Sequence, residues 1–321
     1  MRAEDFRPAV WLPGGHAQTI VPNLLAAPQP PEPVESRFVA VDPQSLVRVD
    51  VDRPAAGARG TLLLLHGLSG CSRSACVLRT AEQALARGWV CARMNLRGAG
   101  DTLEVSRSLY NALQSSDVGL VLDDLERYGL PRPLVAMGFS LGAAIVLRYG
   151  ALTPSGGLAD AIVAANPPID MERSIQAIER PANGLYERYF VGRLCRTVVR
   201  ARRLFDVPGP PVSKGGLRRL RTFDELYTAP SAGMPSAEAY YAAASTGPLL
   251  DRVSRPTLIV SSRNDPFIPI DSFRPYHGHA SGAVTFLHPR SGGHMGYWQR
   301  GRPRFWVARA ALDSLDAMLA R

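Results

Sequence analysis

A serine between two glycines is the first feature of this sequence that could do chemistry. Residues 138–142 read GFSLG, directly after the apolar run PLVAM and before the helical run LGAAIVLRYG. A strand that turns sharply into a helix exposes the serine hydroxyl and crowds its neighbours, so glycine is needed on both sides. The GxSxG spacing alone recurs by chance, but its place after a strand makes Ser140 a candidate nucleophile.

Two later residues could activate this serine. A serine hydroxyl needs a base to remove its proton and a carboxylate to orient that base. After a nucleophile on such an elbow, the acid and then the histidine follow along the chain. Asp265 follows the apolar run PTLIV, and His294, preceded by two glycines, follows the run VTFLH. The order predicts a catalytic triad of Ser140, Asp265 and His294; the alternative is that Asp265 caps a helix and His294 fills a turn.

Acyl transfer also needs two backbone amides to stabilise the oxyanion. One is expected from Leu141, the residue after the nucleophile. The other is expected from Leu68 in the segment HGLSG, which ends the apolar run TLLLL and has glycines that allow close backbone approach. We interpret His66 in the same segment as a structural hydrogen-bonding residue beneath the site rather than a second base.

These residues must be positioned by a sheet. Short apolar runs, several of them continuous, alternate with helical patterns, as expected for a mostly parallel sheet buried on both faces. The predicted strands are Glu35–Val41, Leu46–Asp52, Gly60–His66, Trp89–Asn95, Pro133–Gly138, Ala161–Ala165, Thr257–Ser261 and Ala283–His288. The predicted helices are Arg73–Arg87, Ser115–Tyr128, Ser140–Tyr149 and Pro303–Leu319. The pattern predicts an α/β fold with an eight-stranded, mostly parallel sheet flanked by helices.

The alternation of strands and helices is interrupted once. Residues 166–246 are mostly helical and rich in Arg and Tyr, which predicts a helical cap inserted over the carboxyl ends of the strands. The core is then expected to comprise residues 34–165 and 247–321. Residues 1–33 are rich in proline and predicted to be irregular, wrapping the surface.

Composition excludes several classes of protein. The chain has 321 residues, of which 46% are hydrophobic and 20% charged, as in ordinary globular proteins. Its formal net charge is +9, and Lys214 is its only lysine. This arginine bias is not a nucleic-acid footprint, and no nucleic-acid partner is expected. Basic residues do concentrate between Arg188 and Arg221, where they form either a solvated helix face or a contact with anionic membrane surfaces.

The N-terminal residues MRAEDFRPAV lack the apolar stretch of a signal peptide, and no apolar run in the sequence approaches the length of a membrane span. Its four cysteines lack CxxC spacing and are read as reduced thiols. They are Cys71, Cys76, Cys91 and Cys195. We therefore expect a soluble, cytoplasmic protein; the sequence does not give its oligomeric state.

Other possible sites are weaker. His277 and His279 could form a metal pair, but no third ligand lies nearby in the sequence. The acid pairs at 123–124 and 224–225 are expected on solvated helix edges. The segment LRGAGD is neither a Walker nor a dinucleotide fingerprint, so no cofactor and no metal are expected.

Longer motifs carry a resemblance over most of the chain. They are WLPGGHAQTI, HGLSG, NLRGAGD, GFSLGA, FDELYTAP, YYAAAS, SSRNDPFIP and GGHMGY. In these segments the sequence resembles the YheT-like α/β-hydrolases, bacterial relatives of a eukaryotic esterase and phospholipase subfamily. The resemblance implies the α/β-hydrolase fold and a carboxylic-ester hydrolase acting through Ser140, Asp265 and His294. It also implies that the segment GGHAQT packs near the site, although no role follows for His16.

One departure from the family pattern bears on function. The family usually reads NHRG where this chain has Asn95-Leu96-Arg97-Gly98, which removes the His-x4-Asp pair associated with acyl transfer and leaves Asp101. The primary prediction is a serine hydrolase that cleaves a small-molecule or lipid ester with a short to medium acyl chain. The alternatives are an acyltransferase, a non-catalytic binding protein, and a lipase that docks on membranes through its basic cap.

Residues of the presumed cap could hold the acyl group of such an ester, because binding sites of this kind are mostly apolar. The candidates are Leu185, Tyr186, Tyr189 and Phe190. Packing of the cap onto the core is the alternative role.

Overall fold

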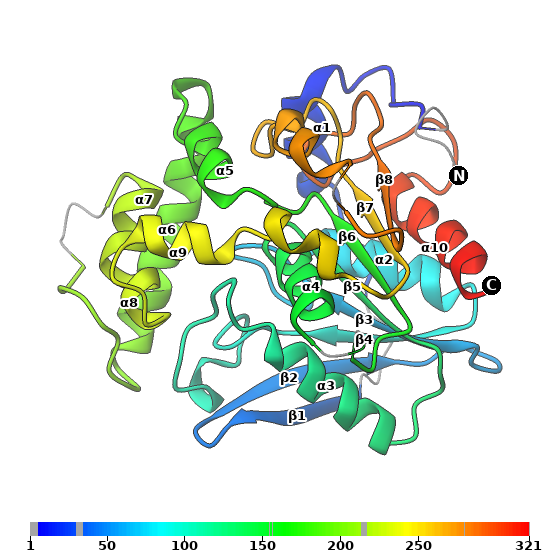
Figure 1. Ribbon diagram of the computed structural model, residues 1–321, viewed down its shortest axis with the longest axis horizontal. Helices are drawn as coiled ribbons and strands as arrows, with labels where there is room; N and C mark the ends of the chain where they lie inside the picture. Colours follow the sequence, from blue (N-terminus) through cyan, green and yellow to red (C-terminus); the bar gives the residue numbers. More distant parts are fainter. Residues whose placement is uncertain are drawn as a thin grey trace.

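Eight strands form one sheet through the middle of the molecule, in the order β1-β2-β4-β3-β5-β6-β7-β8 (Figure 1). The computed structural model describes residues 6–29, 35–153, 155, 157–212, 217–278 and 280–320. The strands are β1 (Glu35–Asp42), β2 (Ser45–Asp52), β3 (Gly60–Leu65), β4 (Trp89–Met94), β5 (Leu134–Phe139), β6 (Ala161–Ala165), β7 (Thr257–Val260) and β8 (Val284–Leu287). All eight lie where the apolar runs predicted them.

Strand direction also follows the prediction of a mostly parallel sheet. β1 pairs antiparallel with β2, and β2 pairs antiparallel with β4, whereas every pairing from β4 to β8 is parallel. Every residue of β3, β4, β5 and β6 is buried, which explains their uninterrupted apolar sequences. The carboxyl ends of the parallel strands therefore meet at one edge.

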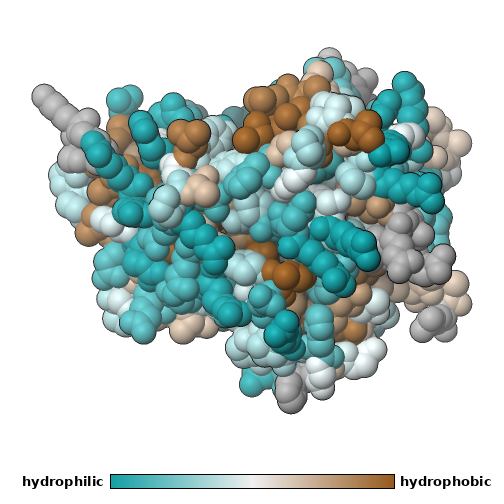
Figure 2. All heavy atoms as spheres, turned by 90° about the horizontal axis from the view of Figure 1, so that it is seen from above, coloured by the Kyte–Doolittle hydropathy of each residue, from teal (hydrophilic) through white to brown (hydrophobic). Residues whose placement is uncertain are grey.

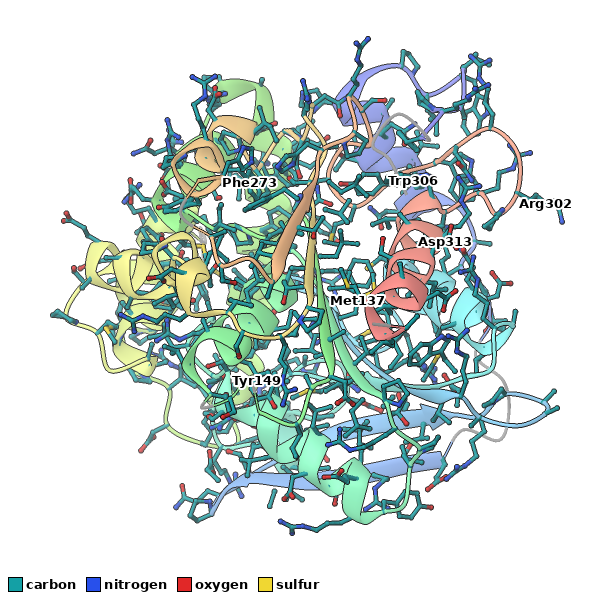
Figure 3. All side chains as sticks on the ribbon, turned by 45° about the vertical axis from the view of Figure 1, so that its right-hand side comes forward. Met137, Tyr149, Phe273, Arg302, Trp306 and Asp313 are labelled. Carbon is teal, nitrogen blue, oxygen red and sulfur yellow. The ribbon has the colours of Figure 1, made fainter. Side chains whose placement is uncertain are left out.

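Helices cover both faces of the sheet and bury two hydrophobic cores. α2 (Ala75–Leu85) and α10 (Trp306–Leu319) pack on one face. α3 (Ser116–Arg127) and α4 (Leu141–Leu152) pack on the other. Figure 3 shows the two layers, with Trp306 on α10 and Tyr149 on α4 on opposite sides of the strand that carries Met137. The predicted α/β fold class is confirmed.

A second group of helices follows β6. It contains α5 (Met171–Ile178), η4 (Pro181–Asn183), α6 (Gly184–Ala201), α7 (Leu220–Phe223), η5 (Asp224–Thr228), α8 (Ala229–Ser231), α9 (Ala237–Ala244) and η6 (Gly247–Arg252). Figure 1 shows most of this group to one side of the sheet, which fits the insertion predicted over residues 166–246. The division into core and cap domains stays a prediction. The short helical turns η2 (Leu103–Val105), η7 (Ile270–Ser272) and η8 (Arg274–Tyr276) lie in connecting loops.

The N-terminal segment contains a helix that the sequence did not predict. α1 spans Gly14–Leu24, so the expectation of irregular structure over residues 1–33 is wrong here; residues 1–5 and 30–33 lie outside the described part. The sequence does not indicate this helix, because several of its features lower helix propensity. They are two glycines at its start, Pro22 in its interior and the absence of a side-chain N-cap. Contacts with the rest of the protein must hold this helix in place.

Among the described residues, no helix combines the length and apolar character needed to cross a membrane. The cytoplasmic location stays a prediction. The four cysteines are free, and three of them are buried.

Candidate active site

Ser140 lies on the strained turn that joins β5 to α4. Its backbone has φ 52° and ψ −115°, a combination that non-glycine residues rarely adopt. A Cβ atom at Gly138 would lie 2.1 Å from the carbonyl oxygen of Gly142, and one at Gly142 would lie 2.4 Å from that of His66. Both glycines are therefore required by close backbone approach, as the motif predicted.

The three residues of the predicted triad form a continuous hydrogen-bonded chain. His294 Nε2 lies 3.0 Å from Ser140 Oγ, and His294 Nδ1 lies 2.8 Å from Asp265 Oδ2. The side chain of Asp265 is fully buried and that of His294 is 5% exposed, so water does not compete for the second contact. The three side chains thus have the mutual geometry that acyl transfer requires of a nucleophile, a base and an orienting carboxylate.

The Asp265 carboxylate is fixed from several sides. Its Oδ1 accepts hydrogen bonds from the backbone amides of Phe267, at 2.8 Å, and Ile268, at 3.1 Å. Its Oδ2 accepts a 2.6 Å bond from the side-chain amide of Asn166 besides facing His294. These donors leave the carboxylate a single orientation toward the imidazole. Asn166 has no motif around it that identified this role from sequence.

The two predicted oxyanion residues lie beside the nucleophile. Gly67 approaches so closely that a Cβ atom there would lie 3.1 Å from the Cβ of Ser140, which brings the HGLSG loop next to the elbow. The Ser69 amide is already occupied, because it donates to the Tyr110 hydroxyl at 2.8 Å. Within the described chain, the backbone amides of Leu68 and Leu141 have no protein acceptor. They are the donors that remain for an oxyanion.

His66 makes the structural contacts predicted for it. Its Nδ1 bonds to the Gly67 carbonyl oxygen at 2.8 Å, and its Nε2 accepts from the Leu96 amide at 3.1 Å. Complete burial lowers the pKa of His66 to about 4, so the ring is neutral at neutral pH. His66 thereby ties the HGLSG loop to the segment after β4.

An apolar chamber opens next to these two amides. It has a volume of about 80 Å³ and extends between the core and the helices that follow β6. Its lining includes both predicted oxyanion residues and side chains from α5, α6, α7, η5, α8 and α9. These are Leu68, Leu109, Tyr110, Asn111, Leu141, Met171, Ile175, Leu194, Thr197, Leu220, Phe223, Asp224, Tyr227, Thr228, Ser231, Tyr240 and Tyr241.

None of the residues that the sequence suggested for an acyl pocket line this chamber. Leu185 is 82% exposed and Tyr189 is 56% exposed, because both lie on the solvent side of α6. Tyr186 and Phe190 instead pack their rings against Phe267. Helix α6 does contribute to the chamber, but through its opposite face.

Asp224 is the acidic residue among the described residues that line the chamber, and its predicted place on a solvated helix edge is wrong. Its carboxyl is buried and accepts hydrogen bonds from Thr228 Oγ1, at 2.6 Å, and Tyr241 Oη, at 2.7 Å. Burial raises the pKa of Asp224 to about 6. The acid pair at 123–124 instead lies where predicted, and both residues pair with arginines there.

The raised pKa makes part of the protein's stability depend on pH. The folded state holds the Asp224 proton more tightly than the unfolded chain does, so this contribution is complete below about pH 4 and lost as the pH rises through 6. Between these values the free energy of unfolding should fall by up to about 3 kcal/mol relative to the variant Asp224→Asn, which does not titrate. Urea unfolding of both proteins across this range measures the effect. A constant difference would show that the pKa is not raised.

The N-terminal helix braces the histidine loop, a role that sequence reasoning missed. The His294 amide donates to Thr19 Oγ1 at 2.8 Å, and that hydroxyl in turn donates to the Gly15 carbonyl oxygen at 2.7 Å. Fully buried Gln18 bonds both the amide and the carbonyl oxygen of Trp298. The motif GGHAQT therefore lies against the site, as the resemblance implied.

The glycines of this region are required by the same packing. A Cβ atom would lie 1.9 Å from the Asn264 carbonyl oxygen if added to Gly15, and 1.5 Å from that of Gln18 if added to Gly296. At Gly293 it would lie 2.4 Å from the Gly15 carbonyl oxygen. The backbone of helix α1 thus packs directly against the backbones of two loops, the one that carries Asp265 and the one that carries His294.

Removing the Thr19 hydroxyl should impair catalysis more than binding. Thr19→Val keeps the shape of the side chain but leaves the His294 amide without its acceptor, at a cost of about 1–3 kcal/mol. Because small displacements of a catalytic group are costly, we expect kcat to fall roughly 10- to 100-fold with little change in KM. Thr19→Ser, which keeps the hydroxyl, is the control and should restore kcat. Equal kcat values for the valine and serine variants would rule out this positioning role.

His16 links α1 to α6. Its Nδ1 lies 3.1 Å from the Tyr186 hydroxyl, and the two rings stack at 5.8 Å. Tyr186 packs edge-on against Phe267, with their ring centroids 4.7 Å apart. The Phe267 and His294 ring centroids are 4.8 Å apart. His16 therefore begins an aromatic chain that ends at the imidazole of the triad.

The weaker sites of the sequence acquire other partners. His277 faces His288, with their Nε2 atoms 3.2 Å apart, and His279 lies outside the described residues. No group of three or more His, Cys, Asp or Glu side chains in the described ranges is arranged to hold a metal ion. Leu96 is buried, and Asp101 pairs with Arg48 at the surface.

The fold and the arrangement at Ser140 agree with the comparison to known families. The family model described as alpha/beta hydrolase fold matches residues 60–301, about three quarters of the sequence. The chain therefore belongs to the α/β-hydrolase family, and the expectation of a hydrolase is confirmed at this level.

Individual relatives refine this assignment. The chain is 28% identical to YheT of Escherichia coli (strain K12), which is named as a candidate esterase, over 98% of this chain and 94% of that protein. It is 27% identical to the human phospholipase ABHD3, over 94% of this chain and 75% of the relative. The resemblance to YheT-like proteins is thus confirmed.

A solved structure supports the fold alone. The crystal structure of the α/β-hydrolase GrgF from Penicillium sp. sh18 has a TM-score of 0.62 at 17% identity. The match covers 90% of this chain and 100% of that one.

Proposed function

We propose that this protein is a serine hydrolase that cleaves carboxylic esters through an acyl-enzyme on Ser140. The observation that carries the proposal is the hydrogen-bonded chain from Ser140 through His294 to Asp265, next to two unoccupied backbone amides. The names of its relatives, an esterase and a phospholipase, support an ester as the bond that is cleaved.

The geometry supports a reaction in two halves. Ser140 Oγ attacks the ester carbonyl while His294 Nε2 takes its proton, and the Leu68 and Leu141 amides stabilise the oxyanion. Collapse breaks the bond to the alcohol, which leaves with the proton from His294. Water then attacks the acyl-enzyme by the same route and releases the carboxylic acid. Asp265 holds the imidazole tautomer and stabilises the imidazolium formed in each half.

The acyl group of the substrate fits the apolar chamber. Leu68 and Leu141 belong both to the oxyanion site and to the chamber lining, so an acyl chain that extends from the reacting carbonyl can enter it directly. The lining is mainly Leu, Ile, Met, Phe and Tyr side chains, which favours short to medium aliphatic acyl groups. The alcohol half of the ester must then extend away from the chamber.

Filling the chamber should shorten the preferred acyl group. Leu194 on α6 lines the chamber, so Leu194→Trp removes space from it. We expect kcat/KM for p-nitrophenyl octanoate to fall about tenfold or more, while that for the acetate changes little, because excluded methylenes lose their apolar contacts. Leu185→Trp makes the same substitution on the exposed side of α6 and should change neither value. Equal losses on acetate and octanoate would place the acyl group elsewhere.

A further inference from the structure

Helix α6 has two different faces. Its buried residues Val191, Cys195 and Val198 pack toward the core. Leu194 and Thr197 line the apolar chamber. The opposite face forms a continuous stripe at helical spacing, every residue of which is exposed. This α6 stripe consists of Leu185, Arg188, Tyr189, Gly192, Arg193, Arg196, Val199 and Arg200.

The charge of the α6 stripe is not balanced by its neighbours. It contains four arginines and no acidic residue, and the nearby Glu187 is buried and pairs with Arg219. Within the described ranges none of the four arginines lies in an ion pair, although Arg127, Arg132 and Arg221 on other surface segments do. The stripe therefore presents an uncompensated positive surface.

Large apolar side chains stand between these arginines. Leu185 is 82% exposed, Tyr189 56% and Val199 43%. Figure 2 shows a comparable mixture on the left-hand side of its view, where hydrophobic side chains interrupt a mostly hydrophilic surface. Basic residues interleaved with exposed apolar and aromatic residues on one helix face are typical of helices that lie in a membrane interface.

We propose that the α6 stripe is the surface by which this protein docks on membranes that contain anionic phospholipids. The arginines contact the lipid phosphates, and Leu185 and Tyr189 insert among the head groups. Docking places the membrane against α6, whose other face lines the apolar chamber. The inference extends the proposed function, since it supplies the surface on which the enzyme meets an ester made from lipid.

A lipid surface fits the stripe better than a nucleic acid does. Nucleic-acid binding needs arginines that follow a phosphate backbone, and exposed aliphatic side chains such as Leu185 and Val199 contribute little to it. They gain free energy only on entering an apolar phase. Binding to a nucleic acid is therefore an outcome that the experiment must separate.

The test is cosedimentation with vesicles of phosphatidylcholine alone or mixed equally with phosphatidylglycerol. The variant replaces Arg188, Arg196 and Arg200 with glutamine. Each arginine near an anionic surface strengthens binding about fivefold, so the variant should partition roughly a hundredfold more weakly into the mixed vesicles. The matched control replaces Arg252, Arg290 and Arg302, three exposed arginines outside α6, and should bind as the wild type does. Figure 3 shows Arg302 projecting from the loop before α10.

The outcomes separate this inference from the enzymatic proposal. Binding of the wild type should require phosphatidylglycerol and weaken in about 0.5 M NaCl, which screens the attraction. Hydrolysis of soluble p-nitrophenyl butyrate without vesicles should be the same in all three proteins. Absence of vesicle binding, salt-independent binding, equal loss in both triple variants, or stripe-dependent binding to a duplex oligonucleotide instead of vesicles would each overturn the docking proposal. None of these results would affect the role of Ser140.

Discussion

Ser140→Ala should reduce kcat/KM for p-nitrophenyl butyrate by roughly 10⁴- to 10⁶-fold, to a level set by binding and the oxyanion donors alone. The variant removes Ser140 Oγ, the atom that His294 Nε2 contacts. The base therefore has no nucleophile left to activate. The fold should be unaffected, because the lost hydroxyl faces the site and alanine can adopt the same backbone conformation at comparable cost.

The control for this experiment is Ser116→Ala, which changes an exposed serine on α3. It should retain full activity. Thermal unfolding of both variants should match that of the wild type within a few degrees. Residual activity in Ser140→Ala within tenfold of the wild type would mean that another group attacks the ester.

Arg93→Met should lower the free energy of unfolding by about 3–5 kcal/mol, because it leaves a buried carboxylate without its partner. Arg93 is 1% exposed and bonds Asp52 through Nε, at 2.6 Å, and through a terminal guanidinium nitrogen, at 3.1 Å. A further nitrogen donates to the Ser72 carbonyl oxygen at 3.0 Å. This ion pair joins β2 to β4, where the sheet changes from antiparallel to parallel pairing.

An exposed ion pair provides the comparison. Arg127 pairs with Asp123 on α3, and its side chain is 76% exposed, so Arg127→Met should cost about 0–1 kcal/mol. Urea unfolding of the two variants measures both values. Similar losses in the two variants would show that burial of the Arg93 pair does not determine its contribution.

The sheet and the predicted triad could be foreseen because their signals are local. The buried strands are short apolar runs such as TLLLL and PTLIV, and their ends match the structure within one or two residues. Ser140, Asp265 and His294 each follow such a run. Since parallel strands present their carboxyl ends at one edge, the chain order was enough to predict that these side chains meet.

The features that were missed depend on contacts between distant segments. Helix α1 is held by Gln18 and Thr19, whose partners lie more than 270 positions away along the chain. The chamber is assembled from loops and from a series of separate helices between α4 and α9, so no single amphipathic pattern reveals which residues line it. Asp224 lies beside Glu225 in an acidic dipeptide, and only the packed structure shows that its carboxyl is buried.

Labelling with a fluorophosphonate measures directly whether Ser140 forms a covalent intermediate. Such a probe phosphonylates a serine only where a base activates it beside an oxyanion site. Mass spectrometry of the digested protein should show one modification, on the peptide that contains Ser140, with loss of esterase activity in proportion to labelling. An unlabelled Ser140 in protein that still hydrolyses p-nitrophenyl butyrate would show that Ser140 is not the nucleophile.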